Sequence, residues 1–75
     1  MNKHKKRKLK KRIKKLVNLQ THIDLVSLKL DLAKRRLEMC EDEAAMKELE
    51  LAMIQNMRTI LDLEARVNRV GEHHA

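Results

Sequence analysis

The chain of 75 residues has no proline, no phenylalanine, tyrosine or tryptophan, and only one glycine and one cysteine. Because proline and glycine are the usual residues of turns and helix ends, their near absence predicts an almost wholly helical chain. The lone Cys40 excludes an internal disulfide, and no Cys/His spacing typical of a zinc site occurs, so neither a metal nor a cofactor is expected. Any core has to be built from Leu, Ile, Val, Met and Ala.

Features of catalysis and of membrane insertion are missing as well. The sequence has no glycine-rich phosphate loop and no Ser/His/Asp set, so we do not expect an enzyme. Polar residues interrupt the apolar positions of segment 16–32, which argues against a signal-peptide core or a membrane span. A single unpaired cysteine fits a reducing compartment. We therefore expect a soluble cytoplasmic or nucleoid-associated protein, nuclear in a eukaryotic cell, and not a secreted one.

What the sequence does contain is a dense block of positive charge near its start. Ten of the eighteen Lys and Arg residues fall between Lys3 and Lys15, and the formal net charge of the whole chain is +7. Like charges at this density repel each other, so the block gains stability by meeting an anionic surface. The strongest such surface is duplex nucleic acid, because each phosphate that Lys or Arg neutralises releases condensed counterions. The predicted nucleic-acid-binding residues are Lys3, Lys5, Lys6, Arg7, Lys8, Lys10, Lys11, Arg12, Lys14 and Lys15.

The composition of this block predicts how it binds. Only Arg7 and Arg12 are arginines, and lysine acts as a point charge where arginine offers a planar fork, so contacts to the phosphate backbone are favoured over base reading. The absence of aromatic side chains argues against single-stranded targets, where bases normally stack on aromatic rings. Duplex DNA is the favoured partner and RNA the second.

Two heptad patterns follow the basic block. In each, apolar residues recur at alternating steps of three and four, as on one face of a helix. The first pattern runs through Leu16, Leu19, Ile23, Val26, Leu30, Ala33, Leu37, Cys40 and Ala44, and the second through Met46, Leu49, Met53, Asn56, Ile60, Leu63, Val67 and Val70. The predicted oligomerisation residues are Leu16, Leu19, Ile23, Val26, Leu30, Leu37, Leu49, Met53, Asn56, Ile60, Leu63 and Val67.

The shift between the two patterns favours a reversal of the chain. Continuing the first pattern past Ala44 would place Lys47 and Arg58 in the apolar seam, so we predict a helical hairpin that turns within 40–45. Asp42 is a suitable N-cap for the second helix. Because Glu, Ala and Met are good helix formers and no glycine marks the bend, the alternative is one long helix in a parallel coiled coil. Gly71 is predicted to end the last helix in a left-handed conformation.

A second apolar stripe predicts association between chains. A chain of this length buries too small a core to be comfortably stable as a monomer. Further apolar residues lie off the two seams, at Leu25, Leu28, Leu32, Met39 and Met46 and at Leu51, Ile54, Leu61 and Ala65. A four-helix bundle uses a wider apolar face than a two-stranded coiled coil does. Asn56 either pairs with its symmetry mate to fix the register or faces water at the edge of the bundle.

These features define an all-α protein: an antiparallel helical hairpin that dimerises into a four-helix bundle or coiled coil and carries a basic N-terminal helical extension. The expected divisions are a basic segment 1–15, a hairpin 16–70 and a tail 71–75. The leading functional hypothesis is a non-enzymatic nucleic-acid-binding protein with an accessory or regulatory role. The alternative is a small helical adaptor, inhibitor or assembly factor, viral proteins included, which docks its basic segment on an acidic protein.

Overall fold

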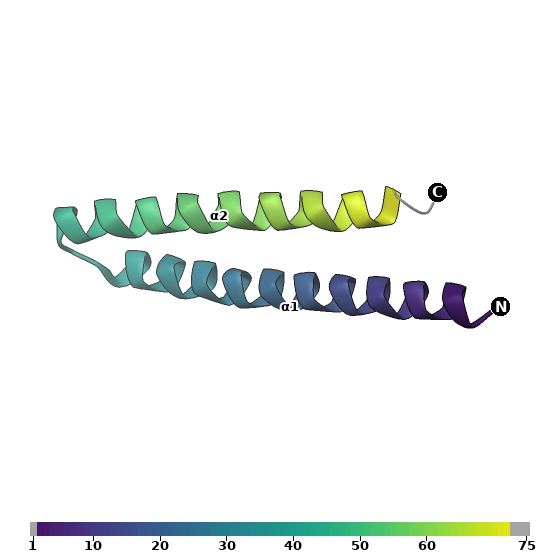
Figure 1. The fold of residues 1–75 in the computed structure, drawn as a ribbon. Coiled ribbons are helices and arrows are strands. Elements are labelled where there is room, and N and C mark those ends of the chain that lie inside the picture. The colour runs from purple at the N-terminus through teal and green to yellow at the C-terminus, as the bar shows by residue number, and fades with distance from the viewer. Residues whose placement is uncertain (1, 73–75) are drawn as a thin grey trace.

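The chain folds into a hairpin of two long helices in a computed structural model that describes residues 2–72. Helix α1 spans Lys3–Met39 and helix α2 spans Glu43–Glu72, and the described residues contain no strand. The helices lie side by side in opposite directions and form a rod with extents of 61 × 16 × 12 Å (Figure 1). The predicted hairpin is thus confirmed, and the single long helix is wrong.

The reversal lies within the predicted corner and is held by local hydrogen bonds. Cys40 ends α1 in an extended conformation, and its backbone N–H donates to the carbonyl of Leu37 at 3.2 Å. The Oδ2 atom of Asp42 accepts a hydrogen bond from the backbone N–H of Ala45 at 3.2 Å. This bond satisfies one of the free N–H groups at the start of α2, so the prediction of Asp42 as its N-cap is confirmed. A corner without glycine is possible because none of its residues needs a positive φ.

The outer ends of the helices differ from expectation in two ways. Asn2 caps α1, because its Oδ1 atom accepts a hydrogen bond from the backbone N–H of Lys5 at 2.8 Å, a role that the sequence analysis did not assign. The prediction that Gly71 ends the last helix is wrong: α2 continues through Glu72, and Gly71 has no positive φ. Val70 is buried, so packing holds the last described turn in helical form. The rest of the predicted tail, 73–75, lies outside the described residues.

The two heptad seams face each other inside the hairpin. Val26, Ala33, Leu63 and Val70 are buried and form its core. The other predicted oligomerisation residues are all half-buried, namely Leu16, Leu19, Ile23, Leu30, Leu37, Leu49, Met53, Asn56, Ile60 and Val67. The residues predicted to join two chains therefore lie along the interface between α1 and α2 of one chain.

Three seam residues differ in detail from the prediction. Ala44 is exposed, because the chain has already reversed and Ala44 belongs to the first turn of α2. Met46 is half-buried as the first member of the second seam and is not part of the exposed stripe. Asn56 is half-buried beside Ala33 of α1, where both border a groove of about 230 Å³. Asn56 thus lies along the seam between the two helices of its own chain.

The second apolar stripe remains exposed on both helices. On α1, Leu25, Leu28 and Leu32 are 54%, 60% and 53% exposed. On α2, Leu51 and Leu61 are 58% and 65% exposed. The hairpin by itself therefore covers only one apolar stripe of each helix, which leaves large apolar side chains in contact with solvent.

Candidate nucleic-acid interface

The basic block forms the first turns of α1 and extends beyond the end of α2. All ten Lys and Arg residues from Lys3 to Lys15 are helical. Leu19 and Val70 border the same groove, and α2 ends only shortly after Val70, at Glu72. Because the helices run in opposite directions, the first turns of α1 reach past the last described turn of α2 (Figure 1). The outer part of the block thus lies on turns that the described part of α2 leaves uncovered, while Lys15 borders a groove with residues of α2.

The basic side chains of the block surround the helix, and all but one are exposed. The exception is Arg12, which is half-buried. Leu9 and Arg12 continue the heptad spacing of Leu16 upstream, so Arg12 lies in line with the seam. Its Nε atom is buried and has no hydrogen-bond partner. An arginine stem that packs against the apolar seam has less reach toward a ligand, so Arg12 is the least available of the predicted contacts.

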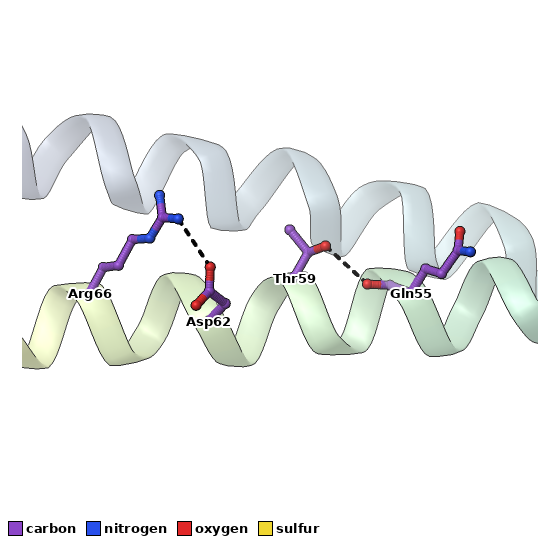
Figure 2. A network of polar contacts seen from close by, with 4 residues as sticks. All are labelled: Gln55, Thr59, Asp62 and Arg66. Carbon is purple, nitrogen blue, oxygen red and sulfur yellow. Dashed lines mark hydrogen bonds and ion pairs between the residues drawn. The ribbon is translucent and has the colours of Figure 1, made fainter.

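The positive charge of the block is not compensated by acidic side chains. Among the side chains that the structure describes, the one ion pair joins Arg66 and Asp62 of α2, at 3.2 Å between Nη2 and Oδ2 (Figure 2). The first turn of α1 contains no acidic residue. The N-terminus of a helix carries a partial positive charge, which disfavours nearby cations and favours anions. Repulsion within the block and the helix dipole therefore both favour the binding of an anion.

Four cationic side chains of the block converge on one face of α1. Lys3, Lys6, Arg7 and Lys10 surround a shallow hollow of about 190 Å³ on the surface of α1. Residues three and four positions apart are neighbours on a helix, so these four side chains converge on one face. An anion in this hollow meets cationic donors on several sides. The arrangement provides positive charge and hydrogen-bond donors.

The fold adds two cations from α2 that the sequence analysis had not assigned to the site. Arg66 and Arg69 border an open groove of about 500 Å³ together with Lys15 and Leu19 of α1. Both arginines lie near the C-terminal end of α2, where cations offset the helix dipole. Pairing the two predicted seams in opposite directions also places them beside Lys15, so the predicted hairpin already indicated this position.

Arg66 remains available for an external anion although it contacts Asp62. Both side chains of this pair are more than half exposed, at 57% and 59%. Exposed ion pairs contribute only about 0.2–1 kcal/mol, so a phosphate can compete for the guanidinium. Figure 2 shows the pair on α2, in line with the hydrogen bond that Thr59 Oγ1 donates to the carbonyl of Gln55 at 3.0 Å.

Other kinds of site have little support in the described part of the chain. Within residues 2–72, no three His, Cys, Asp or Glu side chains gather as metal ligands. His73 and His74 lie outside this range. No helix in the same range is both long and apolar enough to cross a membrane. Comparisons with protein-family models, curated proteins and solved structures found no match.

Proposed function

We propose that the protein is a non-enzymatic nucleic-acid-binding protein whose basic block contacts the phosphate backbone of a duplex. The observation that carries this proposal is the exposure of nine Lys and Arg side chains without described ion-pair partners on the first turns of α1. Arg66 and Arg69 add charge at the inner end of the same surface. The role is accessory or regulatory, since the surface supplies binding and no chemistry.

The dimensions of the block suit a duplex. Its thirteen residues form a helical segment about 20 Å long, at a rise of about 1.5 Å per residue. Duplex DNA carries one negative charge for about every 1.7 Å of its axis, so a segment of this length meets many phosphates. An α-helix also fits the major groove, where lysines on its sides reach the phosphates of both strands. Binding of this kind depends weakly on base sequence.

Association of two chains is the second part of the proposal. The exposed stripes on α1 and α2 supply apolar surface that a solvated monomer leaves uncovered. A dimer carries two basic blocks and therefore makes about twice as many phosphate contacts. Because each contact multiplies the affinity, dimerisation strengthens binding to long duplexes far more than it strengthens binding to short ones.

The proposal is tested by neutralising one face of the block. The variant Lys6→Gln/Arg7→Gln/Lys10→Gln removes three charges from the overhanging turns, and we expect it to weaken binding to a generic duplex at least tenfold. A matched control, Lys34→Gln/Lys47→Gln/Arg58→Gln, removes the same charge from exposed positions elsewhere and should bind nearly as the native chain does. Circular dichroism establishes that both variants keep their helices.

Two further measurements separate the proposal from its alternative. Deleting residues 1–12 should abolish duplex binding while the paired seams from Leu16 onward stay helical. Replacing Arg7 by Lys should have little effect if recognition is through phosphates. A native chain that binds neither DNA nor RNA at low salt would reject the proposal and favour the adaptor, whose basic block docks on an acidic protein.

A further inference from the structure

The exposed face of α1 carries a second heptad pattern of its own. Leu25, Leu28, Leu32 and Met39 are separated by steps of three, four and seven residues. Arg35 lies between Leu32 and Met39 and divides the last step into three and four. At about 100° per residue, this outer stripe lies about 150° around the helix from the seam that faces α2. Its leucines are each more than half exposed, and Met39 is 85% exposed. The outer stripe is thus directed mostly away from the hairpin, although Leu32 also borders the groove between the two helices.

Opposite charges flank the two sides of the outer stripe. In the usual heptad lettering, Leu25 and Leu32 occupy a positions and Leu28 a d position. Asp24 directly precedes Leu25, and Asp31 directly precedes Leu32. Lys29 follows the d-position Leu28, and Arg36 follows Arg35 at the next d position. The acidic residues therefore occupy g positions and the basic residues e positions of the outer heptad. In a parallel pair of helices, a g residue faces the e residue five positions later on the other helix.

The spacing in this chain matches that rule twice. Asp24 faces Lys29 of a second copy, and Asp31 faces Arg36 of a second copy, and the two-fold symmetry of a dimer repeats each pair. An antiparallel arrangement brings each flank against the same flank of the other copy. Aspartates would then approach aspartates, and Lys29 would approach its own symmetry mate. The charges of the outer stripe consequently select the parallel orientation.

These four charged groups form no ion pair within the described hairpin. The described side chains form one ion pair, Arg66 with Asp62, and neither Asp31, Lys29 nor Arg36 takes part in it. Asp24 accepts a hydrogen bond from Gln20 Nε2 at 3.0 Å, which leaves a carboxylate oxygen for a second contact. All four flanking residues are exposed. Forming the intermolecular pairs therefore breaks no ion pair of the hairpin.

The stripe on α2 has the same spacing and is interrupted by Arg58 as the α1 stripe is by Arg35, but its flanks are less complementary. Glu50 and Glu64 lie on one side of Leu51, Ile54 and Leu61, and Asp62 lies on the other side. It lies about 150° from the α2 seam, so it also faces outward, away from the stripe on α1. One second copy in side-by-side contact cannot cover both stripes, and the charges distinguish the α1 stripe as the self-complementary one.

We propose that the outer stripe of α1 is the docking surface for a second copy of this chain, in parallel and in register. The two α1 helices form the centre of the assembly and the two α2 helices lie outside. Asn18 and Thr21 continue the stripe toward the basic block, and a polar residue at an a position, as Asn18 is, fixes register in parallel pairs. This inference deepens the proposed function, because parallel docking places both basic blocks at one end, beside each other on one duplex.

A cysteine cross-link tests the orientation. The variant Met39→Cys/Cys40→Ser has a single thiol at an a position of the outer stripe. In a parallel dimer the two Cα atoms approach to about 5–7 Å, within reach of a disulfide. In an antiparallel dimer centred on Leu28 they lie about 33 Å apart. We expect a cross-linked dimer in a glutathione redox buffer without nucleic acid. The control Leu51→Cys/Cys40→Ser places an exposed thiol on α2, and it should not cross-link.

Charge reversal provides an independent measurement on the same surface. Asp31→Arg converts two symmetry-related ion pairs into two like-charge pairs and should weaken dimerisation about tenfold in sedimentation equilibrium. Adding Arg36→Asp restores opposite charges across the interface, so the double variant should recover most of the lost affinity. Circular dichroism checks that helicity is retained. A monomer in sedimentation, an absent cross-link at Met39→Cys, or a double variant no better than the single one overturns the proposal.

The experiments above contain no nucleic acid, so their outcome does not depend on duplex binding. Repeating the cross-link with a generic duplex, below the concentration at which free chains dimerise, tests the link between the two. A duplex that binds both blocks stabilises the dimer by mass action, and the yield should rise. An unchanged yield while the duplex is bound would overturn the placement of both blocks at one end.

Discussion

The dependence of duplex binding on salt follows quantitatively from the exposure of the basic block. Nine of its ten Lys and Arg side chains are exposed, and they are distributed around the whole circumference of α1. About half of them can face one duplex at the same time. Six contacts for a dimer are therefore a lower limit, and each contact contributes about −0.9 to the slope of log K against log salt.

Six contacts give a slope of about −5, so affinity should fall about a thousandfold or more between roughly 50 and 200 mM salt. Fluorescence anisotropy of a labelled generic duplex measures this slope directly. A second duplex of equal length and different sequence should give nearly the same affinity, because phosphates carry no sequence information. The variant Lys6→Gln/Arg7→Gln/Lys10→Gln should reduce the slope, by about 1 for each lost contact.

Two results would refute this reasoning. A slope shallower than about −3 would mean that most of the exposed cations do not meet phosphates. A steep slope that the triple variant leaves unchanged would place the contacts elsewhere on the hairpin. The matched variant at Lys34, Lys47 and Arg58 controls for a general effect of net charge, since it alters the charge of the chain equally.

Three further predictions concern the hairpin and the inner end of the site. Leu63 is 2% exposed, so Leu63→Ala should lower the free energy of unfolding by about 2–5 kcal/mol and unfold the hairpin at a much lower denaturant concentration. Leu61 is 65% exposed, so the control Leu61→Ala should change the stability little. Asp42→Ala removes the N-cap of α2 and should cost about 1 kcal/mol, measured by thermal unfolding; an unchanged midpoint would contradict the capping role. Arg66→Gln/Arg69→Gln should lower duplex affinity and make the salt slope shallower by up to about 2, and no effect would confine the site to α1.

Features that depend on near neighbours in the chain could be predicted from the sequence. The 3–4 spacing of apolar residues gave both seams, and Val26, Ala33, Leu63 and Val70 are buried where that spacing places them. The shift of the pattern near 44–46 indicated a reversal, and Asp42 indicated where the next helix begins. The density of Lys and Arg between Lys3 and Lys15 marked the candidate interface before any fold was known.

Only the tertiary structure decided which surfaces remain free. Heptad spacing predicts that a face is buried but does not identify the helix that covers it. The structure shows that the seam residues pack α1 against α2 within one chain. Because the hairpin satisfies these seams internally, the second stripe becomes the exposed one. The same pairing brings Arg66 and Arg69, about fifty residues away in the sequence, next to Lys15.

The course of the last helix is decided in the same way. Glycine in isolation favours a helix end, and Gly71 was expected to provide one. Val70 is buried beside Leu19 of α1, and this contact keeps the last described turn of α2 helical through Glu72. The two helices, the N-cap of α2 and the basic block could thus be predicted from the sequence. The partners of each face depend on contacts between residues far apart in the chain, which only the folded hairpin defines.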